Sequence, residues 1–499
     1  MREISAINLR PLDRVVRLSA LILALFTTFY ISLVQLNGVD FWLLAKLGQI
    51  TLSNGAIPKT LLFPFTEIAT EHFNAHEWFA SILFYWGIQA LGEQGMAVLA
   101  GVLGIGLFLL LARLAHVHSG ASLPIALFCG LLGLGTENYR HVIRPELVAL
   151  FCMAVFWIQY EKLSQTFQWR HFLVAAGATI VWTSVHGSFI LAAFIAVMYA
   201  SGALLDGLRT THSLRGAFST PALRLCGAAA CIALCTLLNP FGFELIEFAF
   251  GFGGNNELGR LIGEWTPTFS TSLLGLRGLW ISMAAWLLVF SAVLATRNTL
   301  RSVDWMIFFF FTVLAIKAIR FPVFLCFLIP LYLPRALQQW APNIMFGQRG
   351  FVPLALAASL ILISAAAFGN AHSAYPLLDV TRTKFTEAMA REVENPAHSG
   401  KVLNSMRLGP ELIYRSYPRL RPASDCRLDS YGLDYLMYLD AVLHEEKRFH
   451  EFVDRYGVQY LLLEMPDFIR FEKFETWTAG EWEIVLLDEK AAFLRRHAP

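Results

Sequence analysis

The sequence predicts an α-helical polytopic membrane protein that ends in a small α/β domain. Hydrophobic residues make up 56% of the 499 residues and charged residues only 15%, whereas a soluble protein carries about 25% charged residues. Apolar runs of membrane length follow one another from about residue 18 to 370. A helix needs roughly 20 apolar residues to cross a bilayer, and these runs are too long for the strands of a barrel. Membrane helices are therefore predicted for this part of the chain.

The apolar runs predict about eleven spans. They lie near 18–36, 95–113, 121–137, 145–161, 172–185, 188–205, 222–240, 276–296, 303–318, 321–335 and 351–369. The segment 78–91 is shorter than a full crossing and rich in Trp and Tyr, so we expect it to lie along the outer membrane surface. Residues 172–205 form either two short helices broken at His186 or one long tilted helix.

Basic residues predict the orientation of the spans, because Lys and Arg favour the cytoplasmic side. Arg2, Arg10, Arg14 and Arg17 precede the first run. This run is longer than the apolar part of a signal peptide and has no small-residue cleavage site after it. We therefore expect an uncleaved first span and a cytoplasmic N-terminus. If 78–91 is not a span, the later basic clusters also fall inside, and the C-terminal tail lies outside the cytoplasm.

The tail changes to a charged and polar composition, which predicts a boundary between a membrane domain, residues 1–370, and a soluble α/β domain, residues 371–499. Alternating apolar runs and amphipathic stretches predict its elements. We expect helices at about 382–394, 408–416, 432–456 and 465–478, and strands near 402–404, 458–463, 483–487 and 492–494.

Charge and cysteine content exclude two classes of function. The net charge is +2, and no basic stripe with interleaved aromatics is present, so a nucleic-acid partner is not expected. Six of the seven cysteines lie in apolar runs, where they are small hydrophobes, and Cys426 stands alone in the tail. This pattern predicts neither a disulfide framework nor a metal–thiolate site.

Two carboxylates bracket the first outer loop, predicted at residues 37–94. Asp40 follows the first span directly, and Glu77 follows His76 and precedes Trp78. Carboxylates near a membrane surface lose part of their hydration, so they could activate a hydroxyl, bind a divalent metal or hold a sugar. Alternatively, both cap the helices that follow them.

Cations and further polar residues lie in other outer segments. Arg144, with Glu146 beside it, ends the polar turn that starts at Asn138, and Arg320 follows a short helix. The planar fork of Arg suits phosphate, although snorkelling at the interface is the alternative. His186 interrupts an apolar stretch, as a functional histidine or a helix-break residue. Glu264 is a further candidate substrate ligand or a plain surface acid.

Short motifs in a fixed order give the sequence a family resemblance. The motifs are Asp40 after the first span, Gly55 to Pro58, His76 to Trp78, Arg144 to Glu146, Val185 to Gly187, Gly409 to Tyr414, Asp425 to Gly432 and Tyr456 to Val458. In them the chain resembles the GT-C superfamily of polytopic membrane glycosyltransferases, which use polyprenyl-phosphate-linked sugars. The pattern is similar to the bacterial protein mannosyltransferase and lipid A aminoarabinose transferase branches.

This resemblance implies hexosyl or pentosyl transfer from a polyprenyl-phosphate donor at the outer face of a bacterial inner or plasma membrane. It implies that Asp40 is the catalytic or metal-organising acid and that Glu77 assists. Related sequences often carry a His four residues after this acid, where this chain has Leu44. Two alternatives therefore stay open: a non-catalytic assembly partner in envelope glycan synthesis, and a lipid or glycan transporter.

Overall fold

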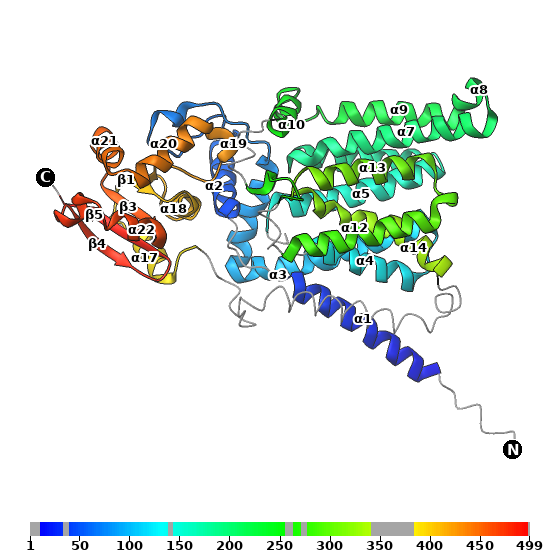
Figure 1. Cartoon of the computed structure of the whole chain (residues 1–499), viewed down its shortest axis with the longest axis horizontal. Coiled ribbons are helices and arrows are strands. Elements are labelled where there is room, and N and C mark those ends of the chain that lie inside the picture. Colours follow the sequence, from blue (N-terminus) through cyan, green and yellow to red (C-terminus); the bar gives the residue numbers. More distant parts are fainter. Residues whose placement is uncertain are drawn as a thin grey trace, which may run out of the picture.

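The computed structural model describes residues 10–32, 39–137, 143–254, 263–270, 277–340 and 384–497. A helical body and a C-terminal α/β domain lie at opposite ends of the molecule, and helix α2 (Val39–Asn54) lies between them (Figure 1). The short helix α8 (Leu214–Ala217) marks the far end of the body. We call the end that faces the α/β domain the domain end.

Most helices of the body follow the predicted apolar runs, but α2 lies within the predicted first outer loop and the helix at 244–254 lies in no predicted run. Besides α2 and α8 they are α1 (Arg10–Ser32), α3 (Trp78–Ser119), α4 (Leu123–Glu137), α5 (Pro145–Gln165), α6 (Trp169–Thr183), α7 (Ile190–Thr211), α9 (Thr220–Cys235), α10 (Glu244–Gly254), α12 (Arg277–Thr296), α13 (Ser302–Lys317) and α14 (Leu325–Trp340). Within the described ranges, five helical segments are long and apolar enough to cross a membrane. The predicted span at 351–369 and the domain boundary at 370 lie outside the described residues, so the total of about eleven spans stays a prediction.

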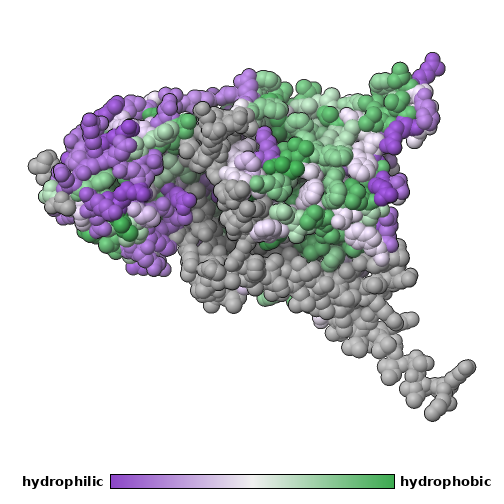
Figure 2. Space-filling model, viewed as in Figure 1, coloured by the Kyte–Doolittle hydropathy of each residue, from purple (hydrophilic) through white to green (hydrophobic). Residues whose placement is uncertain are grey.

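The surface of the body agrees with a membrane environment. Hydrophobic residues gather over the helices, and hydrophilic residues cover the α/β domain and the far end of the body (Figure 2). Large apolar side chains such as Leu173 and Val313 are each 64% exposed on this helical part. Such exposure is unfavourable in water over so wide an area, and a bilayer removes the cost.

Helix α3 is two helices joined at a kink. Gly92 has φ +66° inside the 42-residue element, a conformation that only glycine adopts without strain. The predicted separation of 78–91 from the next span is therefore confirmed. Its position along the membrane surface stays a prediction.

Helices α2 and α3 approach each other at Gly48. A Cβ atom placed on Gly48 would lie 2.1 Å from the backbone oxygen of Ser81 in α3. Beneath this contact, Phe41, Trp42 and Phe84 belong to one buried apolar cluster. Close backbone packing and the apolar cluster together fix α2, which carries Asp40.

A break at His186 separates α6 from α7. The chain leaves α6 at Thr183 and resumes in the short 3-10 helix η3 (Gly187–Phe189), which leads into α7. Of the two alternatives for residues 172–205, two helices is therefore correct.

An ion cluster is buried at the end of the body opposite to the α/β domain. Arg301 forms ion pairs with Glu161 at 2.9 Å and Asp304 at 2.8 Å, and both carboxylates are fully buried. His118 lies 3.2 Å from Glu161, and Arg335 lies 3.4 Å from Asp304. Residues of three basic clusters that the sequence predicts on one membrane side thus meet in this ion cluster.

The α/β domain is built on a five-stranded mixed sheet with the order β2-β1-β3-β5-β4. Strand β1 pairs in parallel with β2 and β3, and β5 pairs antiparallel with β3 and β4. The strands are β1 (Gly400–Asn404), β2 (Leu420–Pro422), β3 (Tyr460–Glu464), β4 (Trp482–Leu487) and β5 (Ala491–Arg496). The helices are α17 (Glu387–Glu394), α18 (Gly409–Ser416), α19 (Leu428–Tyr431), α20 (Leu433–His444), α21 (Glu446–Tyr456), α22 (Met465–Phe471) and α23 (Glu475–Thr478).

Most of these elements match the prediction. Strand β2 was not predicted, because its three residues include Pro422, and the predicted helix 432–456 is two helices. Helix α18 packs on α2, and this contact joins the α/β domain to the helical body.

Candidate active site

Three of the predicted site residues meet at the domain end of the helical body. Asp40 lies in the first turn of α2, Arg144 directly precedes α5, and Glu264 lies in the 3-10 helix η4 (Gly263–Trp265). Arg144 Nε is 3.3 Å from Asp40 Oδ2, and Arg144 Nη1 donates a hydrogen bond of 2.8 Å to Glu264 Oε1. One guanidinium therefore bridges two carboxylates from distant parts of the chain.

Arg320 lies beside this group. Its backbone N–H donates to the carbonyl oxygen of Glu264 at 3.3 Å, and its guanidinium carbon lies 4.7 Å from the ring centroid of Trp265. A further backbone bond from Ile319 to Thr266 holds the segment against the end of α13. The structure thus brings Asp40, Arg144, Glu264 and Arg320 into one neighbourhood.

Cys426 of the α/β domain also contacts Asp40, which the sequence reasoning missed. Its Sγ lies 3.5 Å from Asp40 Oδ1 and donates a hydrogen bond. Burial, followed by the negative charge of Asp40, raises the pKa of Cys426 well above its usual value. The thiol therefore stays protonated at neutral pH and remains a donor. Only the fold reveals this contact, because the two residues are 386 positions apart in the sequence.

Glu77 and His76 lie in a different neighbourhood from Asp40. His76 Nε2 is 3.8 Å from Glu77 Oε1, and the imidazole ring is 4.9 Å from the ring of Phe248. Glu77 occupies the N-cap position of α3, but its side chain makes no capping hydrogen bond. Asp40 meets Arg144 and Cys426, while Glu77 and His76 lie at the start of α3.

His186 makes the contacts of a helix-break residue. Its Nδ1 accepts a hydrogen bond of 3.2 Å from the backbone N–H of Ser188 and lies 2.8 Å from the Ser188 hydroxyl. The preceding residues reach the start of α3, because Phe79 N–H donates to the carbonyl oxygen of Ser184 at 3.1 Å. His186 thus lies on the side of the body where Glu77 begins α3.

Glu146 and Leu44 also lie close to the residues of the site along the chain. Glu146 is partly buried in the first turn of α5, two residues after Arg144. Leu44, four residues after Asp40, is 6% exposed within the apolar cluster of α2. The side chains that face Asp40 are therefore an arginine and a thiol.

The residues around Asp40 do not form a donor set for a divalent metal. In the part of the chain that the structure describes, no three His, Cys, Asp or Glu residues cluster as metal ligands would. The guanidinium of Arg144 lies between Asp40 and Glu264, where a divalent cation would need both carboxylates. We therefore derive no step through a metal.

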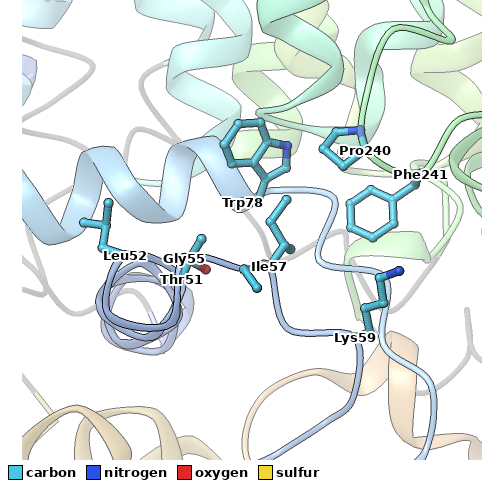
Figure 3. Close-up of a pocket in the computed structure, with 9 residues that line it drawn as sticks. Thr51, Leu52, Gly55, Ile57, Lys59, Trp78, Pro240 and Phe241 are labelled. Carbon is cyan, nitrogen blue, oxygen red and sulfur yellow. The ribbon is translucent and has the colours of Figure 1, made fainter.

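A pocket of about 550 Å³ opens near the other end of α2. Figure 3 shows Trp78, Phe241 and Pro240 across from Ile57, with Lys59 at the edge. Its lining residues are Thr51, Leu52, Gly55, Ala56, Ile57, Lys59, Trp78, Pro240 and Phe241. The pocket borders the neighbourhood of Glu77, which directly precedes Trp78.

Comparison with solved structures decides the fold. The chain matches the archaeal oligosaccharyltransferase AglB from Archaeoglobus fulgidus, solved with an inhibitory peptide and a dolichol-phosphate, with a TM-score of 0.58 and 13% identity over 93% of this chain and 71% of that one. It matches ArnT from Cupriavidus metallidurans in the apo state with a TM-score of 0.54 and 13% identity over 96% of this chain and 97% of that one. The chain has the GT-C fold.

This GT-C fold extends over both parts of the chain, since the match to ArnT covers nearly the full length of each protein. No protein-family model and no curated protein matches the sequence. At 13% identity the likeness concerns the GT-C fold, and any activity has to be argued from the residues of this chain.

Proposed function

We propose that this protein is a membrane glycosyltransferase that moves a sugar from a polyprenyl-phosphate-linked donor to an acceptor on the outer face of a bacterial inner membrane. The observation that carries the proposal is the bridge that Arg144 forms between Asp40 and Glu264. The bridge supports the proposal because it brings an acid together with an arginine, a residue type suited to binding phosphate, and Arg320 lies beside them. The AglB structure with a dolichol-phosphate supports the same class of donor.

The proposed reaction is an inverting transfer. Asp40 accepts the proton of the acceptor hydroxyl as the oxygen attacks the anomeric carbon of the sugar. The bond between that carbon and the phosphate oxygen breaks, and the polyprenyl phosphate leaves with one more negative charge. Arg144 and Arg320 stabilise this charge, because arginine pairs with phosphate through two parallel N–H groups.

The remaining predicted residues bind the substrates or orient Arg144. Glu77 and His76, which border the pocket at Trp78, would bind the acceptor or the sugar. Glu146 follows Arg144 and would orient it, while His186 would contact the donor phosphate. Glu264 holds Arg144 until the donor arrives and so keeps the guanidinium in place.

Incubation of the purified protein with labelled polyprenyl-phosphate hexose and pentose donors, together with a lipid extract as acceptor source, tests the proposal. We expect turnover, and we expect Asp40→Asn to abolish it without loss of folding, because the amide accepts no proton. Asp434→Asn, at an exposed position of α20, is the matched control. Full activity in Asp40→Asn would overturn the assignment.

The same assay separates the alternatives. Donor binding without turnover would identify a non-catalytic assembly partner, in line with Leu44. Movement of labelled lipid across a vesicle membrane without transfer would identify a transporter. Thermal unfolding of each variant distinguishes lost chemistry from lost structure.

A further inference from the structure

Building on the proposed function, we propose that the α/β domain completes the active site: residues 425–427 hold the α2–α3 loop (residues 55–77) in place and set the Cys426 thiol against Asp40. Cys426 and Arg427 are then positioning residues for the candidate catalytic acid. Three independent sets of contacts carry this inference.

The first set consists of the contacts between Arg427 and the α2–α3 loop. The side chain is 6% exposed, and its Nη2 donates to the backbone carbonyl oxygen of Leu61. The guanidinium carbon lies 4.4 Å from the ring centroid of Phe73 and 5.3 Å from that of Phe63. A single arginine of the α/β domain therefore contacts three points of the loop. Since the site is buried, each contact is worth more than at an exposed surface.

The second set fixes Arg427 within its own domain. Asp425 is fully buried and accepts hydrogen bonds from Arg427 Nε at 3.0 Å and Nη2 at 2.5 Å. The backbone N–H of Asp425 donates to the hydroxyl of Tyr431 at 2.9 Å. Both neighbours of Cys426 are thus anchored, so the direction of its side chain is set by the fold.

The third set is the orientation of Asp40 itself. Oδ1 accepts the hydrogen bond from Cys426, and Oδ2 faces Arg144 at 3.3 Å. Each carboxylate oxygen therefore has a partner, one from the α/β domain and one from the helical body. These contacts hold the carboxylate in one orientation, which a general base needs to reach the acceptor hydroxyl.

Further contacts along the same interface keep the domain docked. Tyr435 shares a hydrogen bond of 2.7 Å with Thr66, and Arg415 pairs with Glu93 of α3 at 3.1 Å. The ring of Tyr414 lies 4.9 Å from that of Trp42, two residues after Asp40. The contacts of Arg427 with the α2–α3 loop are thus part of a continuous interface between the α/β domain and the helical body.

The first test is the split between kcat and KM of transfer for two variants of Cys426. Cys426→Ala removes the donor that orients Asp40, so kcat should fall about tenfold while KM stays unchanged, and Cys426→Ser should restore kcat. Cys231→Ala, at an exposed position of α9, is the control and should leave both constants unchanged.

The second test needs no activity. Hydrogen exchange of residues 61–73 should become about tenfold faster in Arg427→Gln, because the loop loses its buried anchor. Arg427→Lys keeps a charge for Asp425 and serves if the glutamine variant does not fold. Arg455→Gln is the control, since Arg455 pairs with Glu67 of the same loop at 3.0 Å but is exposed.

The outcomes separate the two proposals. If Asp40→Asn abolishes transfer while Cys426→Ala keeps the wild-type kcat, the positioning role is wrong and the proposed function survives. If Asp40→Asn retains transfer, the proposed function fails, and hydrogen exchange alone tests whether Arg427 anchors the α2–α3 loop. Unchanged exchange in both Arg427 variants would overturn that anchoring role.

Discussion

Arg144 is the residue on which the candidate site depends most directly. It bridges Asp40 and Glu264, and all three side chains are partly exposed, at 25% for Arg144 and 38% for each acid. Ion pairs with this exposure contribute about 1 kcal/mol or less to stability. The ion pairs therefore add little to stability, and the role proposed for Arg144 is in binding the donor.

Replacing Arg144 should separate those two contributions. Arg144→Gln should lower transfer by about 100-fold, because the leaving phosphate loses a charged partner, while the unfolding temperature changes little. Kinetics on the purified protein and a thermal scan provide the two measurements. Arg209→Gln, exposed near the end of α7, is the matched control. A large loss of stability in Arg144→Gln would instead indicate a structural role.

Two variants of His186 distinguish a structural role as the cap of η3 from a role in binding the donor. His186→Ala removes the side-chain acceptor for Ser188 N–H and should destabilise the protein by about 1 kcal/mol, whereas His186→Asn supplies a new acceptor. If His186 only caps η3, the asparagine variant should recover both stability and binding of polyprenyl phosphate. Recovered stability with weaker binding would place His186 in the donor site.

At the scale of helices and loops, sequence patterns predict the elements but not the contacts between them. The composition of the apolar runs predicts the helices, and Gly92 coincides with the expected interruption before residue 95. Asp40 and Glu77 were singled out because both border the same loop. That reasoning could not supply the partners of Asp40, because Arg144 and Cys426 come from distant parts of the chain.

The contact between α2 and α3 gives a prediction at this scale. Gly48→Ala should destabilise the protein by about 1–3 kcal/mol, because the new methyl group meets the backbone of Ser81. Transfer should fall as well, since α2 carries Asp40. Gly177→Ala in α6 meets no atom within 4 Å and is the control. Thermal unfolding of both variants in detergent checks this, and equal stability would contradict the close packing.

For the whole molecule, the buried ion cluster at the far end joins helices that the sequence does not link. Glu161 of α5 and Asp304 of α13 share Arg301, and His118 of α3 lies against them. Arg301 belongs to one of the basic clusters that the sequence predicts on the cytoplasmic side, and that side stays a prediction. The sequence could not show the acids beside Arg301, because complementary charges in separate helices meet only through packing.

Arg301→Met tests how much this ion cluster contributes to stability. Two fully buried carboxylates would lose their main cation, so we expect destabilisation of about 3 kcal/mol or more. Arg297→Met, four residues earlier and exposed, should be nearly neutral. Thermal unfolding and the yield of folded protein after detergent extraction measure the difference. A small effect in Arg301→Met would mean that Arg335 and His118 suffice to neutralise the acids.

The contact between Cys426 and Asp40 has a consequence for biosynthesis. The two residues are 386 positions apart, and at about 5–20 residues per second a ribosome needs on the order of 20–80 seconds to travel between them. Asp40 therefore reaches the membrane surface long before its thiol partner has been made. The centre is finished only when the end of the chain has been delivered, so a protein truncated during synthesis would sit in the membrane without a complete site.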